Sequence, residues 1–510
     1  MPSIPQLIYW PVNAYLLFMS VIWLIRLARG FRIRDEKIAD FQSSLLALGE
    51  ERDFAGCPHL FILLPMLREQ RCINEAVEHF SQMPYPGAKT LVIITTQREK
   101  KEKLDFLQAH RSASYASAEY KEILRFIRIN SSGDPIQDFP STESAIDFAE
   151  LLPSTSDFAD ELASDSILHL HYPEAQGVMA HQLNFAIKEL KLSGLANSDA
   201  FYAIYNADSR PEENTFLELL FQIEQDPSKQ VFQQLSLYLN NIPSKEKWWQ
   251  DSVLRCAAWW QCRWSFGWEI PHTRDHAAFL ARYRDRKISP LDSLSQESMV
   301  YTIGHGLFVK DEILQSTGLF PEATMNEDAG FGLLLNWKRI PINLLGHLDR
   351  ASIPESVAVL RKQKCTWYWG VLQAFSYPKH FPDFEKIDCR LFHLSFSLFF
   401  QAVCWFVNPA MIAAALLSGL MLGPVYFAGS LFMPALFLCL PHRTVAEYLR
   451  ERTLAPSYAV PGWRIKDVFF EYVGAIVFFS IHWFGAATCL YQSLIWAITG
   501  NRPVKLKTEG

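Results

Sequence analysis

Apolar runs of membrane-spanning length stand near both ends of this 510-residue chain and enclose a more polar middle. The first run, Leu7 to Ala28, is about 22 residues long, which is enough to cross the ~30 Å hydrocarbon core of a bilayer. Its basic residues begin at Arg26 and follow the run, whereas a signal peptide carries them before its apolar segment. The positive-inside rule therefore predicts an N-terminus outside the cell and a cytoplasmic segment from residue 31 onward.

The apolar runs near the other end of the chain predict further spans. Residues 391–440 are long enough for two transmembrane helices, hinged near Asn408-Pro409 or somewhat later. Residues 441–466 hold several arginines, which predicts a cytoplasmic loop. Residues 467–499 predict one transmembrane helix, which would place the C-terminus outside, or a re-entrant pair. A re-entrant pair, or one interfacial helix among these C-terminal segments, would keep the C-terminus inside. Buried helices of a soluble protein are the alternative, and runs of this length disfavour it.

The polar middle opens with the pattern of a parallel sheet. Residues 59–65 and 90–96 are short, continuous apolar runs typical of buried strands, and 73–80 between them has helical spacing. A strand, a helix and a second strand of these lengths form a βαβ unit. Ligands of such sheets bind beyond the carboxyl ends of the strands. The side chains that follow the two runs therefore indicate a binding site: Arg68, Glu69, Gln97 and Glu99.

The rest of the middle extends this α/β pattern. Residues 101–165 are charged and rich in serine, and we expect helical insertions and loops there. Alternation over 167–172 predicts a strand, 178–190 a helix, and 200–205 a further strand. The aromatic segment 247–268 predicts either a membrane-interface or acceptor-channel element or an aromatic core beneath a helix.

Composition removes several classes of function. The net charge of −6 argues against a chain that binds nucleic acid, which usually has a basic surplus. The nine cysteines include no Cys-x-x-Cys pair, so a zinc site or a redox dithiol is not expected. An odd number of cysteines, several of them in apolar runs, fits buried reduced thiols and a cytoplasmic soluble part.

The first polar cluster, Asn206-Ala207-Asp208-Ser209, follows the strand at 200–205. Alternate residues leaving a strand point the same way, so Asn206 and Asp208 can address one ligand. A carboxylate there can hold a divalent cation that neutralises the charge of a bound diphosphate. The alternative is a simple turn, because Asn, Asp and Ser are also turn residues.

The second cluster, Glu327-Asp328, directly precedes the helical pattern Phe331–Trp337. Transfer of a group to an alcohol needs a base near the acceptor oxygen, and a carboxylate at a helix start can serve. The alternative is helix capping by Asp328. A third cluster places Gln363 and Trp367 four residues apart, and its alternative is an amphipathic helix at the membrane boundary.

The order and spacing of these clusters, with the membrane-length runs around them, resemble a membrane-integrated family 2 glycosyltransferase, similar to processive polysaccharide synthases. The resemblance covers roughly residues 59–375. Asp208 matches the metal-binding second Asp of the Asp-x-Asp motif, and Asn206 stands where the first Asp is usual. Asp328 matches the catalytic base of the Glu-Asp motif of inverting enzymes.

The third cluster resembles the Gln-x-x-Arg-Trp motif of the same family. Gln363 and Trp367 match, and Trp367 would stack on the acceptor sugar. Thr366 replaces the Arg that would meet a phosphate, and Arg361 or Lys364 could take its place. The tail 501–509 also resembles family C-termini, which favours a cytoplasmic C-terminal end.

The resemblance implies an α/β GT-A nucleotide-sugar-binding domain with N-terminal and C-terminal transmembrane helices. The expected organisation is a transmembrane helix at 7–28, a cytoplasmic GT-A domain at 59–350, interfacial helices at 351–388, two spans at 391–440, a loop at 441–466 and a final span or re-entrant pair at 467–499. We expect a multi-pass protein of the cell inner or plasma membrane with its catalytic domain in the cytoplasm.

The expected activity is inverting transfer from a nucleotide-diphosphate sugar, with Mg²⁺ or Mn²⁺, to a surface polysaccharide or glycolipid acceptor. The expected site residues are Asp328 as the base, with Asp208 on the metal; Asn206, Asp208, Glu69 and Glu99 for the donor; and Gln363, Trp367 and Glu327 for the acceptor. Alternatives are single-sugar transfer to a polyprenyl phosphate or glycolipid, or a non-catalytic membrane protein with a decayed transferase domain. The partners would be the donor, a glycan or lipid-linked acceptor, the membrane, no nucleic acid, and in one version an accessory subunit.

Overall fold

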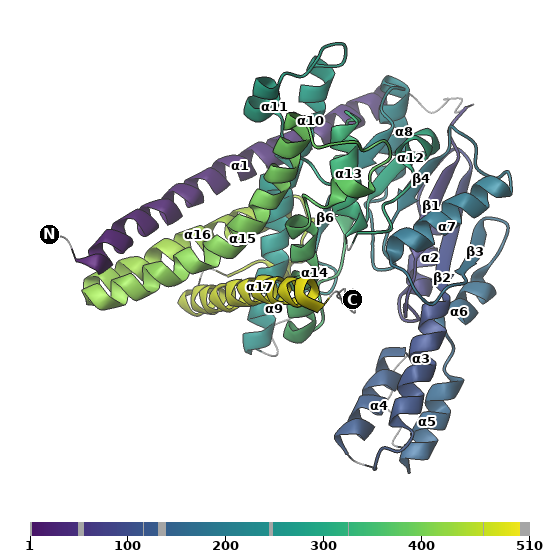
Figure 1. Cartoon of the computed structure of the whole chain (residues 1–510), viewed down its shortest axis with the longest axis horizontal. Coiled ribbons are helices and arrows are strands. Elements are labelled where there is room, and N and C mark those ends of the chain that lie inside the picture. The colour runs from purple at the N-terminus through teal and green to yellow at the C-terminus, as the bar shows by residue number, and fades with distance from the viewer. Residues whose placement is uncertain are drawn as a thin grey trace. The chain divides into compact units, whose positions relative to one another are not determined.

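The structure is a computed structural model that describes residues 3–48, 56–115, 117–130, 139–243, 248–324, 326–462 and 464–499. The tail 501–509, which resembles family C-termini, lies outside these residues. The chain forms two compact units. We call Arg52–Leu220 with Gly304–Glu322 the sheet unit, and Met1–Glu51, Phe221–Ile303 and Ala323–Gly510 together the helical unit. Figure 1 shows the chain and labels many of its elements.

The sheet unit is built on strands in the order β3-β2-β1-β4-β7. Their bounds are β1 Leu60–Pro65, β2 Lys89–Thr96, β3 Ile167–Tyr172, β4 Phe201–Ile204 and β7 Leu307–Lys310. The first four are parallel, and β7 is antiparallel to β4. The α/β pattern predicted from the sequence is therefore confirmed as a sheet rich in parallel strands. Parallel strands are normally covered on both faces, which explains their continuous apolar runs.

Helices connect these strands. The unit contains α2 Ile73–Gln82, α7 Met179–Leu192 and α12 Asp311–Thr317, and α8 Thr215–Gln225 leads out of it. In α2 the buried side chains Ile73, Ala76, Val77 and Phe80 recur at helical spacing, so one apolar stripe faces the protein.

The connection between β2 and β3 carries an insertion with its own core. It comprises α3 Gln97–His110, α4 Ala118–Asn130 and α5 Thr142–Leu151, followed by α6 Thr155–Leu162. Buried apolar side chains of α3, α4 and α5 form a separate cluster around Ile123 and Ile146. Figure 1 shows these three helices side by side. The helical insertion expected at 101–165 is present among the described residues.

The helical unit contains the long helices and a few short strands. Its helices are α1 Ile4–Leu48, α9 Trp248–Trp264, the π-helical turn η1 Ser265–Glu269, α10 Ile270–Arg282, α11 Pro290–Gln296, α13 Glu327–Trp337, α14 Val357–Leu372, α15 Cys389–Leu422, α16 Pro424–Glu451 and α17 Ile465–Thr499. Its 3₁₀ turns are η2 Tyr377–His380 and η3 Ser457–Ala459. Its strands pair as β5 Val231–Gln233 with β8 Asn343–Leu344, and β6 Ser236–Leu237 with β9 Asp349–Arg350.

Among the described residues, four helices are long and apolar enough to cross a membrane: Ile4–Leu46, Cys389–Leu422, Pro424–Glu451 and Ile465–Thr499. Pro409 does not hinge its helix, and the break falls at Gly423, whose φ of 113° suits glycine. The helix α16 continues to Glu451, into the segment expected to be a loop. The last run forms one continuous helix, α17, and not a re-entrant pair.

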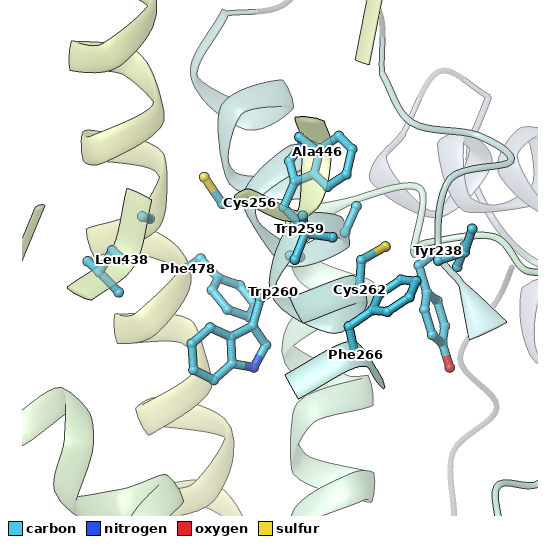
Figure 2. Packing of buried hydrophobic residues seen from close by; sticks show 14 of the residues in the cluster. Tyr238, Cys256, Trp259, Trp260, Cys262, Phe266, Leu438, Ala446 and Phe478 are labelled. Atoms are coloured by element: carbon cyan, nitrogen blue, oxygen red, sulfur yellow. The ribbon is translucent and has the colours of Figure 1, made fainter. Parts of the chain in front are cut away.

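The aromatic segment ends in the core of the helical unit. Trp259 and Trp260 of α9 are buried, and Trp260 meets Phe479 of α17 with ring centroids 4.7 Å apart. Figure 2 shows Trp260 beside Phe478 in this cluster. Gly474 allows close packing there, since an added Cβ would lie 2.7 Å from the Ser252 carbonyl oxygen of α9. The aromatic-core interpretation of the sequence therefore holds for these two tryptophans.

Candidate functional site

In the sheet unit, the carboxyl ends of three strands meet at one edge. Register sets Pro65 of β1 beside Ile94 of β2, and Leu63 beside Ile204 of β4. The segments that follow these strands therefore leave the sheet at the same edge, where ligands of α/β sheets bind. Glu69, Glu99, Asn206 and Asp208 all lie in these segments.

Glu99 organises the loop after β1. Its side chain is buried, and its carboxylate accepts hydrogen bonds from Arg68 N (2.8 Å), Gln70 Nε2 (2.8 Å) and Thr155 N (2.7 Å). Arg68 has a φ of 59°, which is costly for a residue with a side chain, and the bond from its own N–H helps to hold it there. Glu99 thus shapes this edge, and the direct donor contact expected of it stays a prediction.

Glu69 belongs to the same loop and is half-buried. Its backbone N–H donates to Thr155 Oγ1 (3.0 Å), and its carboxylate accepts from the Cys72 thiol (3.2 Å). The loop after β1 is therefore tied to α6 by both Glu69 and Glu99. The donor contact expected of Glu69 also stays a prediction.

Asn206 and Asp208 sit in a braced turn after β4. Ser209 N donates to the Asn206 carbonyl (3.1 Å), and Arg210 Nη1 donates to the carbonyls of Ala207 and Ser209 (2.8 Å each). Ala207 and Ser209 are buried, whereas Asn206 and Asp208 are half-buried. The turn interpretation is right about the backbone, and the turn presents the two candidate side chains partly to solvent.

The donor set at this turn suits a cation that is shared with a substrate. The described residues contain no group of three or more His, Cys, Asp and Glu side chains placed to hold a metal ion. Mg²⁺ is commonly bound by one or two carboxylates together with substrate phosphates rather than by an all-protein cage. One carboxylate, Asp208, with a neighbouring amide oxygen from Asn206 fits that second kind of site.

A polar network beside this edge gave little signal in the sequence. Thr95 Oγ1 lies 2.7 Å from His169 Nε2 and 2.9 Å from His171 Nδ1, and His171 Nε2 lies 3.2 Å from Gln97 Oε1. Burial, followed by the charge of nearby Lys100, lowers the pKa of His171. The alternation of 167–172 predicted the strand, but it did not distinguish its histidines from ordinary strand residues.

In the helical unit, Glu327 and Asp328 form the first turn of α13. Glu327 is buried and Asp328 is half-buried. Asp328 Oδ1 accepts from Ala329 N (2.7 Å), and its carbonyl accepts from Thr302 Oγ1 (2.8 Å). The N-cap residue is Asn326, so Asp328 is not the cap. A carboxylate in the first turn is stabilised by the positive end of the helix dipole.

Asn326 joins this turn to the helix that carries Gln363 and Trp367. Its side chain makes no capping bond, and its Nδ2 donates instead to the Thr366 carbonyl of α14 (3.0 Å). Gly370 makes room for it, since a Cβ there would lie 2.5 Å from Asn326 Nδ2. The structure therefore brings together the second and third sequence clusters within one unit.

Gln363 and Trp367 are both half-buried on α14, one helical turn apart. The Tyr238 ring meets Trp367 edge-on at 6.3 Å, and Lys364 Nζ lies 3.9 Å from the centre of the Trp367 ring. Of the two cations expected to replace the missing Arg, Lys364 is buried and Arg361 is exposed.

A strip of backbone at 300–303 supports Asp328. Asn336 of α13 pairs with both backbone groups of Val300, and Gly332 packs against Tyr301 and Thr302. The Tyr301 hydroxyl donates to Glu269 Oε1 of η1 (3.1 Å) and accepts from Trp264 Nε1 (2.8 Å). Burial and the Glu269 carboxylate raise the pKa of Tyr301 well above its usual value. No spacing in the sequence pointed to this support.

The candidate residues thus fall into two groups. Glu69, Glu99, Asn206 and Asp208 share one edge of the sheet unit, and Glu327, Asp328, Gln363 and Trp367 share the α13–α14 region of the helical unit.

No protein-family model and no curated protein sequence matches the chain. Among solved structures, it resembles the mannosyltransferase PcManGT of Pyrobaculum calidifontis in complex with GDP-Man and Mn²⁺, with 13% identity, a TM-score of 0.38 and coverage of 93% of this chain and 99% of that one. It also resembles residues 1–349 of S. aureus TarS, with 10% identity, a TM-score of 0.34 and coverage of 85% and 92%. TM-scores this low establish neither a shared fold nor a shared activity.

Proposed function

We propose that the chain is an inverting, membrane-integrated family 2 glycosyltransferase with a GT-A nucleotide-sugar-binding domain. It transfers a sugar from a nucleotide-diphosphate sugar to a hydroxyl of a growing surface polysaccharide or glycolipid. The observation that carries the proposal is the hydrogen bond from Asn326 to the Thr366 carbonyl. It joins the turn with Glu327 and Asp328 to the helix with Gln363 and Trp367, so residues separated in sequence form one polar group.

Asp328 is the base in this proposal. It removes the proton from the acceptor hydroxyl as the oxygen attacks the anomeric carbon and the nucleoside diphosphate leaves. General base catalysis of this kind contributes about 10²–10⁴-fold to rate. Its backbone is fixed by Thr302 and its side chain is half-buried, which supports a held but reachable carboxylate.

Asn206 and Asp208 serve the donor, with Asp208 as the protein ligand of Mg²⁺ or Mn²⁺. The cation, when bound, neutralises the negative charge of the leaving diphosphate. The Arg210 brace keeps the two side chains at the carboxyl edge of β4. Glu99 holds the loop that carries Glu69 on the same edge, and Glu69 is the second donor contact.

Trp367 stacks on the acceptor sugar, and Gln363 and Glu327 bond its hydroxyls. The four apolar helices cross the inner or plasma membrane, with the catalytic part in the cytoplasm, as the arginines after the first span favour. The helices α15 and α16 are the two middle spans, and α17 is the last one.

The test is nucleotide release by the full-length protein across a panel of sugar nucleotides, with and without Mg²⁺ or Mn²⁺. Wild type releases nucleotide from one donor, and Asp328→Asn lowers release at least ~10²-fold. Asp383→Asn is the matched control, because Asp383 is an exposed carboxylate of the same unit. Asp208→Asn raises the cation concentration needed for half-maximal release.

Release that is equal in wild type and Asp328→Asn would refute the assignment of the base. No release from any donor would favour a non-catalytic membrane protein with a decayed transferase domain. The size of the labelled product separates a polymer from single-sugar transfer to a polyprenyl phosphate or glycolipid. Adding membrane extract to an inactive preparation tests the need for an accessory subunit.

A further inference from the structure

Lys364 of α14 is a buried cation without a matching anion. Its residue is 2% exposed, and its Nζ lies 3.9 Å from the Trp367 ring centre and 5.7 Å from that of Phe478 on α17. No hydrogen bond or ion pair joins it to a described residue. Burial lowers the pKa of this ammonium to about 7.

An ammonium in this position is costly. Taking a charge out of water is strongly unfavourable unless a counter-charge and hydrogen bonds replace the water. Contact with aromatic faces offsets only part of that cost. A side chain kept in such a place therefore points to a negatively charged group that Lys364 meets in function.

Further basic side chains lie deeper in the same helical unit. Arg263 of α9 is fully buried and donates one hydrogen bond, from Nη1 to the Phe437 carbonyl (2.7 Å), while Nε and Nη2 have no partner among the described residues. Both ring nitrogens of His442 on α16, and Nδ1 of His482 on α17, are likewise buried without a described partner.

Aromatic rings connect these groups into a series. The Trp260 ring lies 4.6 Å from the Arg263 guanidinium, 6.2 Å from the His442 ring and 6.1 Å from the His482 ring. The Phe478 ring centre lies 5.6 Å from that of His482 and 5.7 Å from Lys364 Nζ. We call Lys364, His482, His442 and Arg263 the basic row; Figure 2 shows Trp260 and Phe478, the two rings between its members.

The basic row has no carboxylate of its own among the described residues. The carboxylate on the same helix, Glu471 of α17, is paired with Arg443 (2.6 Å). Lys364 and Arg263 form no ion pair with any described residue. The basic groups of the row therefore lie among apolar side chains with no described carboxylate beside them.

We propose that the basic row binds the phosphate of a lipid-linked acceptor, with Lys364 as its first contact. Two members of the row stand on α16 and α17, which are candidate spans, so the ligand reaches it among apolar side chains, as a lipid does. Lys364 also touches Trp367, the residue proposed to stack on the acceptor sugar. The inference rests on the proposed function for the identity of the acceptor, but the binding of the phosphate does not depend on catalysis.

The test measures binding of farnesyl phosphate to the full chain in phosphatidylcholine nanodiscs, with farnesol and inorganic phosphate as comparison ligands. Farnesyl phosphate raises the melting temperature of the wild type, and the other two do not, because the site needs the tail and the anion together. Lys364→Met weakens the binding of farnesyl phosphate about tenfold or more. Lys362→Met is the matched control, since Lys362 is exposed on the same helix, and it binds as wild type.

Lys364→Met also reports on the protein without ligand. Replacing an unpaired buried charge with an apolar side chain of similar length raises the melting temperature of the ligand-free protein. A lower melting temperature, with farnesyl phosphate bound as in wild type, would mean that Lys364 only packs the helices, and it would overturn the proposal.

The remaining outcomes separate the sources of phosphate. Equal shifts from farnesol would show an apolar site, and equal shifts from inorganic phosphate would show a free-anion site; either result overturns a lipid-linked ligand. The same measurement is repeated in nanodiscs that contain phosphatidylglycerol. If farnesyl phosphate no longer raises the melting temperature there, the basic row binds membrane phospholipid instead. Binding of farnesyl phosphate is measured without a sugar nucleotide, so an enzyme that fails its catalytic test can still pass this one.

Discussion

Two carboxylates, Glu99 and Asp328, differ in what surrounds them, although the sequence suggested a site role for both. Glu99 is buried, and its carboxylate accepts from Arg68 N, Gln70 Nε2 and Thr155 N. Asp328 is half-buried at a helix start, where its carbonyl accepts from Thr302 Oγ1 and its Oδ1 accepts from Ala329 N. Glu99 therefore belongs to the scaffold of its loop, whereas Asp328 stays partly exposed at a helix start.

Gly332 is the residue on which the position of Asp328 depends most directly. A Cβ at Gly332 would lie 2.5 Å from Thr302 N and from Tyr301 Cα, and both are backbone atoms that cannot swing aside. We expect Gly332→Ala to destabilise the protein by about 1–3 kcal/mol, despite the better helix propensity of Ala. Nucleotide release should fall as well, because the bond from Thr302 to the Asp328 carbonyl is displaced. If Gly332→Ala matches wild type in denaturation and in nucleotide release, the backbone at 300–303 can move aside without cost.

His276 of α10 makes stability depend on pH. Burial lowers its pKa to about 4, against the opposing effect of Glu297 and with a small further lowering by Arg390. In the unfolded chain His276 binds a proton near pH 6.5, whereas in the folded protein it does so only near pH 4. The unfolded state therefore binds more protons in this range, and the free energy of unfolding falls as the pH drops from 6.5 to 4. The full effect is about 3 kcal/mol. Between pH 7 and pH 4 the melting temperature of His276→Gln should fall less than that of wild type. An equal fall in both would mean that His276 is protonated when folded.

At the scale of elements, α13 and α14 show what one hydrogen bond contributes to a site. Asn326→Ala removes the bond to the Thr366 carbonyl, at a cost of about 1 kcal/mol. Gly370→Ala forces the Asn326 amide aside and should cost a similar amount in the wild-type background. In the Asn326→Ala background, the same change should cost much less, since the amide it displaces is absent and only the Cβ of residue 326, at 3.3 Å, stays close.

A double-mutant cycle measures this coupling directly. The two single variants and the double variant should melt at similar temperatures, and all three should lose acceptor-dependent turnover. Costs that simply add would mean that Gly370 and Asn326 do not share a contact that matters to stability.

Elements with strong periodicity could be predicted from the sequence, and contacts between them could not. The apolar runs at 59–65 and 90–96 appear as β1 and β2, because continuous apolar residues have no other stable place than a covered parallel sheet. The π-helical turn η1 left no such signature, since it depends on how α9 packs on its neighbours. The roles of Tyr301 and Glu269 follow from that turn and were equally invisible.

The start of α13 shows a smaller limit of the same kind. The sequence placed the helix at Phe331–Trp337 with Asp328 as a possible cap, whereas the helix begins at Glu327. Asn326 has the composition of a capping residue but bonds α14 instead, because Gly370 leaves room for its amide. Local preference identified the right segment, and a contact distant in sequence decided which residue did what.

At the scale of the whole molecule, the chain alternates between its two units. The sheet unit carries the expected donor residues, and the helical unit carries the expected base and acceptor residues. The long helices belong to the second unit, and the Phe392, Phe396 and Phe400 rings stand exposed along one side of α15. Exposed aromatic rings in a row are unfavourable in water and favourable against lipid, which supports the four candidate spans as a membrane-embedded part.

The number of spans determines on which side the chain ends. The helix α17 is 35 residues long, or about 52 Å, which exceeds the ~30 Å core even when the helix is tilted. The link between α16 and α17 carries Arg452 and Arg464, which favour the cytoplasm. With four spans, an N-terminus outside the cell requires a C-terminus outside as well, which contradicts the cytoplasmic end that the tail sequence favours.

We expect four spans, and therefore a C-terminus outside the cell. The helix α17 is one unbroken apolar helix. The basic residues of the tail are matched by basic residues at the start of α17, so charge does not hold the C-terminal end in the cytoplasm. Epitope tags placed at either terminus should be cleaved by protease added outside intact cells, whereas a tag inserted after Pro456 should be protected. A protected C-terminal tag beside a cleaved N-terminal one would mean that α17 lies along the cytoplasmic membrane surface. In that arrangement its face toward α14 would sit at lipid headgroup depth, where Lys364 could meet a lipid phosphate without entering the bilayer core.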